Sequence, residues 1–205
     1  MPKIEPFEEH SDQYEEWFEE NRYIYESELQ AVKEKLPSGN GVEIGVGSGR
    51  FAAPLRVKLG VEPSRKMAEI ARRRGIKVIE GTAEDLPFSD SQFDFVLMVT
   101  TICFVDDLDK SFKEAYRVLK PGGSLVIGFI DRESLVGKLY QGRDSSPFYG
   151  IATFYSVEEV IAYLKEASFK NFEFVQTIYG LETEKIEPVE EGYGKGSFVV
   201  VKAMR

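Results

Sequence analysis

The chain has 205 residues, of which 42% are hydrophobic, a size that suits one domain built around one substantial core. Its 26 basic and 35 acidic side chains give a formal net charge of −9, and such a surface repels a phosphate backbone, so we expect no nucleic-acid partner. The single cysteine, Cys103, excludes an internal disulfide and fits a reducing cytoplasm, and the single histidine, His10, restricts histidine-based mechanisms to one residue.

The N-terminal segment is predicted to be helical. Over residues 8–36 apolar side chains recur at mostly helical spacing between acidic ones, which indicates one or two amphipathic helices that we expect to act as a lid. No apolar stretch has the length of a signal peptide or of a transmembrane helix. We therefore expect a cytoplasmic protein that is neither exported nor embedded in a membrane.

Strands and helices alternate from residue 41 onward. Residues 37–41 (PSGNG) break the helical pattern, and a strand that begins at Val42 runs into glycines. Further strands are predicted at residues 56–61, 77–80, 93–99 and 124–130, and helices at residues 64–74 and 107–119, the second capped by Asp107 and stopped by Pro121-Gly122-Gly123. Because these strands are almost continuously apolar, we expect an α/β fold with a doubly wound, Rossmann-like, mostly parallel sheet covered by helices on both faces.

The C-terminal third differs from the preceding part in composition and periodicity. Residues 131–155 carry glycine, serine, proline and aromatic residues without a sustained period, and we interpret them as an insertion that shapes a substrate pocket. Ser156 and Glu159 have the spacing of a capping box, which predicts a helix to about residue 167. Two β-rich runs at residues 172–178 and 197–203 are predicted to pair antiparallel at the sheet edge. The single domain would thus comprise a lid (1–37), a cofactor-binding core (41–130), the insertion and a C-terminal unit (156–205).

The strongest chemical signal is the glycine-rich turn in VEIGVGSGRF, residues 42–51. Glycine there lets the backbone approach a ligand closely, although a tight structural turn explains such a run almost as well. Glu62 lies at the end of the second predicted strand, where an acidic side chain can accept hydrogen bonds from both ribose hydroxyls of a nucleoside. The alternative explanation is that Glu62 places a favourable negative charge at the start of the following helix.

Two classes of nucleoside cofactor fit a turn of this kind. A dinucleotide site requires a third glycine where this chain has Arg50, which weakens the interpretation as an NAD site. S-adenosylmethionine has no pyrophosphate and needs only backbone groups and a nearby carboxylate, for which Gly45, Val46, Gly47 and Glu43 are candidates. We therefore predict S-adenosylmethionine as the cofactor and keep an NAD-dependent oxidoreductase as the less favoured alternative.

A family resemblance rests on four segments in a fixed order: residues 42–51, residues 61–64 (VEPS) with Met67, residues 81–88 (GTAEDLPF) with Phe93-Asp94, and residues 115–123 (AYRVLKPGG). In these segments the chain resembles the class I S-adenosylmethionine-dependent methyltransferases, in particular the subgroup that includes ubiquinone/menaquinone-biosynthesis C-methyltransferases. The resemblance implies a seven-stranded sheet with an antiparallel C-terminal strand. It also implies an enzyme that transfers a methyl group in line from the cofactor to a small molecule.

The resemblance assigns residues to each part of the cofactor: ribose to Glu62, adenine to Ala83 and Glu84 with Pro63 and Met67 at its faces, and methionine to Thr100. Tyr14, from the predicted lid, completes the expected cofactor site. Two positions depart from the family pattern, since Thr82 stands where many relatives have aspartate and residues 102–104 (ICF) stand where many have histidine. An acidic contact and a histidine base are therefore not expected at these positions.

The substrate side is predicted from position rather than from motifs, because ligands of open α/β sheets bind outside the carboxyl ends of the strands. The lid and the insertion would supply Tyr14, Trp17, Arg132, Lys138, Arg143, Phe148 and Tyr149, which suit a small aromatic or anionic substrate and are equally explained as lid packing. Candidate bases are Asp106, Asp107, Tyr149, His10 and Tyr14, of which the two aspartates also suit helix caps. The run Arg72-Arg73-Arg74 closes a helix and is interpreted as structural. No metal site is predicted, and a protein that binds the cofactor without transferring methyl groups is the main alternative.

Overall fold

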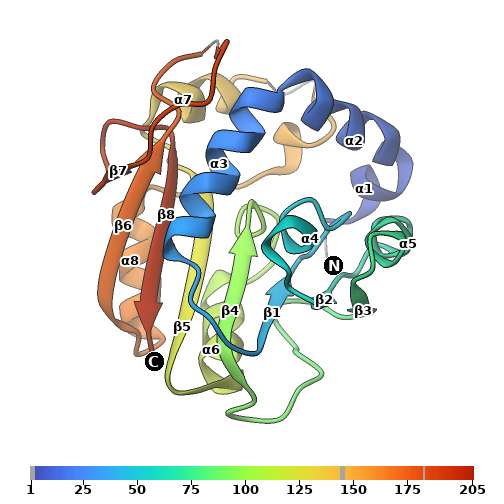
Figure 1. Cartoon of the computed structure of the whole chain (residues 1–205), viewed down its shortest axis with the longest axis vertical. Helices are drawn as coiled ribbons and strands as arrows, with labels where there is room; N and C mark the ends of the chain where they lie inside the picture. Colours follow the sequence, from blue (N-terminus) through green and yellow to red (C-terminus); the bar gives the residue numbers. More distant parts are fainter. Residues whose placement is uncertain (1–2, 144–145, 182) are drawn as a thin grey trace.

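A mixed sheet of eight strands forms the centre of the protein, as seen in a computed structural model that describes residues 3–143, 146–181 and 183–205 (Figure 1). The strands lie in the order β3-β2-β1-β4-β5-β8-β6-β7. Their bounds are β1 Gly41–Ile44, β2 Leu59–Val61, β3 Lys77–Ile79, β4 Phe93–Val99, β5 Leu119–Ile130, β6 Lys170–Thr177, β7 Glu190–Glu191 and β8 Phe198–Met204. The first five strands are parallel, whereas β8 runs antiparallel to β5 and β6, and β7 antiparallel to β6. The predicted doubly wound, mostly parallel sheet is confirmed.

The two predicted C-terminal strands, β6 and β8, pair antiparallel as expected, but their place in the sheet differs from the prediction in two respects. β8 does not lie at the edge of the sheet but between β5 and β6, with pairs from Ser124–Met204 to Ile130–Phe198 along β5. The short strand β7 arises within the polar segment that follows β6, pairs with β6 and forms the edge, so the sheet has eight strands rather than seven. Phe198 and the three valines after it are all buried, a pattern that belongs to a strand covered on both faces.

Helices cover both faces of the sheet, as predicted (Figure 1). On one face α6 (Leu108–Val118) and α8 (Val157–Glu166) share a core cluster with alternate residues of β4, such as Val96 and Met98. On the other face α3 (Arg22–Lys35), α4 (Ala52–Leu55) and α5 (Arg65–Arg73) pack in a second cluster with the intervening residues of β4. The continuous apolar run of β4 is therefore explained by burial on both sides.

Side-chain caps determine where several helices begin, among them three that the sequence predicts. An Asp107 carboxylate oxygen accepts the N–H of Lys110 at 3.0 Å, and Ser64 Oγ accepts the N–H of Met67 at 3.2 Å. Ser156 and Glu159 form the predicted capping box, in which each side chain accepts the backbone N–H of the other residue. The helices α5, α6 and α8 accordingly start at or next to the predicted residues.

Two local predictions are wrong. Residues 56–58 are not part of a strand, because Arg56 ends the unpredicted helix α4 with φ +61° and β2 begins only at Leu59. Pro121-Gly122-Gly123 does not stop α6, which ends at Val118; it lies inside β5, next to a register shift against β4. The insertion at 131–155 contains a helix, α7 (Leu135–Gln141), and a short 3-10 turn, η1 (Tyr149–Ile151).

The N-terminal segment forms three helices, α1 (Glu5–Glu9), α2 (Ser11–Glu20) and α3. Figure 1 shows α1 and α2 over the end of the sheet toward which β1 and β4 point. α3 instead contacts β5, β6 and β8, so it belongs to the core and not to a lid. None of the helices described here combines the length and the apolar character needed to cross a membrane.

Candidate functional site

The glycine-rich turn after β1 passes through left-handed backbone conformations. φ is +65° at Gly45, +53° at Gly47 and +84° at Gly49, a region that glycine enters without steric cost. At Gly45 the space is closed, because a Cβ atom there would stand 2.4 Å from Cγ2 of Thr101. At Gly47 the nearest atom to such a Cβ would be the Tyr14 hydroxyl oxygen, at 3.5 Å. The turn therefore leaves the backbone of Gly47 open toward a cleft.

We expect Gly45→Ala to lower the free energy of unfolding by about 2–5 kcal/mol, because it adds the cost of a left-handed alanine to overpacking against Thr101. Gly75→Ala is the matched control: Gly75 has φ +83° but nothing within 4 Å of the place that a methyl group would take, so only the backbone cost of about 1–2 kcal/mol applies. Urea unfolding measures both. Equal losses in the two variants would show that Thr101 moves aside freely.

Glu62 follows β2 and faces the same cleft. One carboxylate oxygen accepts the N–H of Gly47 at 2.8 Å, and the other accepts the N–H of Ser64 at 2.9 Å. The side chain is buried, and this burial raises the pKa of Glu62 to about 7, against the two backbone hydrogen bonds that lower it. A carboxylate offers about four acceptor positions, so two backbone donors leave room for further donors. Glu62 therefore supports the helix start and also lines the cleft, so its position is compatible with both proposed explanations.

The cleft joins the ends of β1, β2 and β4. It is lined by the predicted residues Tyr14, Gly45, Gly47, Glu62, Pro63, Ala83, Glu84 and Thr100. Ala83 and Glu84 come from the turn after β3, and Glu84 is held in place because it accepts the N–H groups of Asp106 and Asp107 at 2.8 and 3.3 Å. Residues that are distant in the chain thus meet at the carboxyl edge of the parallel strands, where the fold predicts a ligand.

Three predicted cofactor residues do not line this cleft. Glu43, Val46 and Met67 are all buried beneath the turn, with 2%, 4% and 0% of their surface exposed. Met67 lies under Gly47, and Val46 packs in the core cluster of α4 and α5. Burial raises the pKa of Glu43 well above its ordinary value, with the nearby Glu62 adding to the rise. Their side chains are placed to shape the turn from below.

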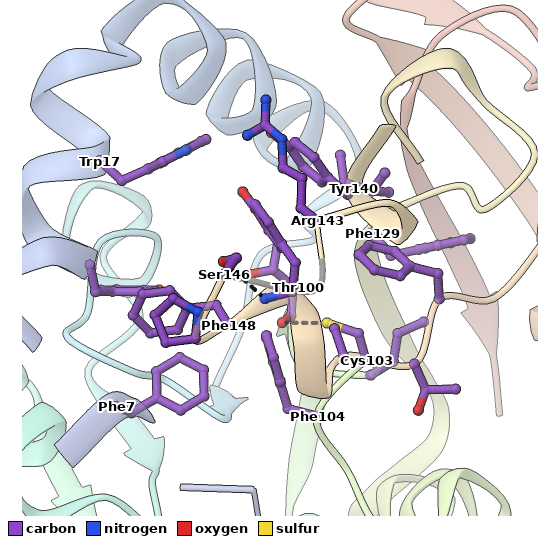
Figure 2. Close-up of a pocket in the computed structure, with 18 of the residues that line it drawn as sticks. Phe7, Trp17, Thr100, Cys103, Phe104, Phe129, Tyr140, Arg143, Ser146 and Phe148 are labelled. Carbon is purple, nitrogen blue, oxygen red and sulfur yellow. Dashed lines mark hydrogen bonds between the residues drawn. The ribbon is translucent and has the colours of Figure 1, made fainter. Parts of the chain in front are cut away.

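A second, larger cavity of about 540 Å³ adjoins the cleft. Figure 2 shows its aromatic lining, with Phe7, Phe104 and Phe148 gathered at one end and Trp17, Tyr140 and Arg143 at the other. The ring of Phe7 makes an edge contact with Phe104 at 5.0 Å between centroids, and Tyr140 stacks on Tyr149 at 4.1 Å. Among the described residues of the lining, Glu28 is the only acidic side chain and Arg143 the only basic one.

Four residues line both the cleft and the cavity: Phe7, Tyr14, Thr100 and Phe104. Thr100, directly after β4, has φ +50°, which is unusual for a β-branched residue and marks a position held by its surroundings. The carbonyl of Thr100 accepts the thiol of Cys103 at 3.3 Å. These residues form the junction between the two spaces.

The structure brings together some, but not all, of the residues predicted for the substrate side. Tyr14, Trp17, Arg143, Phe148 and Tyr149 line the cavity. Arg132 and Lys138 line neither space, and Arg132 pairs with Glu133 and with Glu159 on α8 instead. Cys103 also lines the cavity, and desolvation raises the pKa of its thiol to about 12.

Of the candidate bases, likewise, only some line the cleft or the cavity. Asp107 is used as the cap of α6, and His10, at the junction of α1 and α2, lines neither the cleft nor the cavity. Asp106 lines the cleft, and Tyr149 lines the cavity, where burial raises its pKa. Tyr14 lines both spaces and is partly buried, and desolvation raises the pKa of its phenol. No group of three His, Cys, Asp or Glu side chains in the described ranges is placed to hold a metal ion.

An ion-pair cluster that the sequence did not reveal joins α2 to the glycine-rich turn. Glu15 on α2 accepts from Arg50 at 2.8 Å and from Arg74, and Arg74 also donates to the carbonyl of Ser48 at 2.7 Å. Arg50 lies over the ring of Phe18 at 5.0 Å. Arg50, which stands in place of a third glycine, and Arg74, the last residue of the arginine run, thus hold the lid helix α2 on the turn.

Removing the charge of Glu15 tests this cluster. Glu15→Gln should lower the free energy of unfolding by about 1–3 kcal/mol and speed proteolysis within α2, because two partly buried arginines lose their shared carboxylate. The exposed neighbour provides the control, Glu16→Gln, which should change neither quantity. Chemical unfolding and limited proteolysis report the two effects. A Glu15→Gln protein as protease-resistant as the control would mean that α2 is held by aromatic contacts alone.

Comparison with known proteins adds to this geometry. Residues 42–127 match the family model of the methyltransferase domain. The chain is 54% identical to an S-adenosylmethionine-dependent methyltransferase of Thermotoga maritima, named as a possible histamine N-methyltransferase, and the structures superpose with a TM-score of 0.96 over 98% of this chain and 99% of that one.

Other relatives agree. An uncharacterized protein of Methanocaldococcus jannaschii is 50% identical over 96% of this chain and 97% of its own length. A ubiquinone/menaquinone biosynthesis C-methyltransferase of Rickettsia prowazekii is 38% identical over 68% of this chain, but this match spans only 52% of its own length. With the glycine-rich turn, the acidic residue after β2 and a relative that matches over nearly its full length, the chain belongs to the class I S-adenosylmethionine-dependent methyltransferases.

Proposed function

We propose that S-adenosylmethionine binds in the cleft beside the glycine-rich turn, that a small-molecule acceptor binds in the aromatic cavity, and that the methyl group passes between them at Thr100. The observation that carries this proposal is the junction: Phe7, Tyr14, Thr100 and Phe104 line both spaces. Binding the two reactants on either side of one junction would bring them close together, and such positioning is worth roughly 7–11 kcal/mol in favourable intramolecular reactions.

The residues of the cleft fit this cofactor. Glu62 has acceptor capacity left for ribose hydroxyls, and the open backbone at Gly47 can approach the methionine portion. Pro63, Ala83 and Glu84 would surround the adenine, as the family resemblance implies. Glu43, Val46 and Met67 would act from below, by fixing the shape of the turn.

When bound, the cofactor supplies the reactivity, because its sulfonium gives up the methyl group and keeps the electron pair of the broken bond while the acceptor's lone pair forms the new one. The chain contributes alignment and the exclusion of water. Phe7 on α1 and Tyr14 on α2 cover the junction, and Glu8 fastens α1 by accepting the hydroxyl of Ser64 at 2.7 Å. A lid anchored at both its helices therefore closes the reacting atoms off from solvent.

The size and lining of the cavity indicate the chemical class of the methyl acceptor better than the names of relatives do. One relative is named for histamine, and others are named for ubiquinone/menaquinone biosynthesis, so the names point to different acceptors. A cavity of about 540 Å³ with an aromatic lining suits a small, partly aromatic molecule. The net charge of −9 makes nucleic acid an unfavourable acceptor.

Two measurements test the proposal. Calorimetric titration should show saturable binding of S-adenosylhomocysteine and none of NADH, and labelled S-adenosylmethionine should yield methylated product with a panel of small aromatic metabolites. Thr100→Val should change the affinity for S-adenosylhomocysteine by no more than a few-fold. It should alter the rate of methyl transfer, because Thr100 lies at the junction. If S-adenosylhomocysteine fails to bind, the assignment of the cleft is wrong.

A further inference from the structure

Glu28, on α3, is a buried carboxyl group without a partner. Its residue is 4% exposed, and the little surface that it keeps belongs to the aromatic cavity, which it lines. No hydrogen bond or ion pair links its carboxyl group to any residue in the described part of the chain, and desolvation alone raises its pKa, to about 8. A buried carboxyl group in this condition costs free energy, which a packing role would not require.

The groups around Glu28 are aromatic and bear no opposite charge close enough to pair with it. Tyr14 on α2, Tyr140 on α7 and Tyr149 on η1 line the same cavity as Glu28. Burial is the main cause that raises the pKa of each phenol, and the carboxylate of Glu28 adds to the rise. Arg143 is the other charged group of the cavity, but it is exposed and lies over the ring of Tyr140, at 5.4 Å, rather than on the carboxylate. A carboxyl group beside aromatic rings suits an ammonium group, because the cation can contact the ring faces and pair with the carboxylate that forms when it binds.

We propose that Glu28 recognises the acceptor: the cavity takes a small aromatic amine, whose protonated nitrogen pairs with the Glu28 carboxylate among the rings of Tyr14, Tyr140 and Tyr149. This proposal rests on the proposed function, because it places the acceptor in the same cavity. It narrows the substrate class to cations, and it disfavours the anionic substrate that the basic residues of the insertion had suggested. Glu28 has no part in binding the cofactor, since it does not line the cleft.

Trp17 provides a direct test, because it lines the cavity and is the only tryptophan of the chain. Its fluorescence would be titrated with 2-phenylethylamine, with histamine and with 2-phenylethanol, the neutral counterpart of the first amine. We expect the wild type to bind at least one amine about 30-fold more tightly than the alcohol, and Glu28→Gln to remove this preference while leaving the alcohol's affinity unchanged. Glu34→Gln, an exposed site on the same helix, is the matched control and should retain the preference.

Proton release gives a second readout on the unaltered protein. At about pH 7 most Glu28 side chains are protonated before binding, so pairing with an ammonium should release a proton, measured by calorimetry in buffers of different ionisation enthalpy. Of the groups that face Glu28, the three tyrosines and Arg143 keep their protons at this pH, because the phenol pKa values are raised and the guanidinium is always charged. The amine should bind more tightly as the pH rises from about 6 to 8, and Glu28→Gln should show neither effect.

Either of two results would overturn the proposal: equal binding of amine and alcohol by the wild type, or amine binding that releases no proton. Titration with S-adenosylhomocysteine separates this failure from that of the proposed function. If the homocysteine cofactor binds and the amines do not, only the role of Glu28 is wrong. If S-adenosylhomocysteine does not bind, the assignment of the cleft is wrong, and the amine titrations still test the role of Glu28 independently.

Discussion

Glu62→Ala should weaken the binding of S-adenosylhomocysteine by at least about 100-fold. Two ribose hydroxyls that donate to a carboxylate are each worth about 1.5–3 kcal/mol, and alanine also leaves the N–H groups of Gly47 and Ser64 without their acceptor. The turn and the start of α5 would therefore lose their shared anchor at the same time. Isothermal titration calorimetry measures the change.

The controls separate binding from folding. Glu80→Ala removes an exposed carboxylate just after the neighbouring strand β3 and should leave the affinity within about two-fold. Because the pKa of Glu62 is raised to about 7, the affinity of the wild type should also rise between about pH 6 and 8, as the carboxylate that accepts the hydroxyls forms. Equal affinities of Glu62→Ala and Glu80→Ala would remove Glu62 from the binding site.

The second large effect concerns stability, because Glu28→Gln should make the protein more stable at alkaline pH. Burial raises the pKa of Glu28 from 4.5 to about 8. Between these values the unfolded chain gives up a proton that the folded chain keeps, so the stability of the wild type falls as the pH rises through this window. A tenfold change in proton affinity is worth about 1.4 kcal/mol, so the accumulated cost at about pH 9 is on the order of 5 kcal/mol.

Glutamine cannot ionise, and the variant should escape this cost. At about pH 5, where Glu28 is protonated, the two proteins should agree within about 1 kcal/mol, and the gap should open steadily toward about pH 9. Urea unfolding at several pH values provides the comparison, with Glu34→Gln as the control. Glu43 and Glu62, whose pKa values are also raised, are common to all three proteins and cancel in the differences. Parallel pH profiles for wild type and Glu28→Gln would refute the prediction.

The cofactor side of the site was predictable because it depends on local rules. The turn after β1 needs glycine at positions with positive φ, and Glu62 follows a strand whose end is marked by Pro63, so both could be located from the sequence. The interpretation of Arg50 was only half complete. Its presence argued correctly against a dinucleotide, but its partner Glu15 lies 35 residues away on another helix, and no local pattern reveals that contact.

The substrate side was predicted less well. Glu28 looked like one of many acidic residues on a solvated helix, yet it stands three residues after Tyr25 and four before Val32, on the face that α3 turns inward. Helical periodicity therefore carried a signal that an acidic side chain obscured. Arg132 and Lys138 were expected at the cavity because their segment lies there, but neither lines it, and Arg132 pairs with Glu159 on α8.

By itself, the sequence determined the alternation of strands and helices, the caps of α5, α6 and α8, and the glycine-rich turn, because each depends on the steric and hydrogen-bonding demands of residues close together in the chain. Only the tertiary structure decided that β8 lies inside the sheet, that Phe7 and Phe104 meet across the junction and that Glu28 is left without a partner. These features depend on contacts between distant segments, and their free energy comes from burial in the assembled core rather than from local preference.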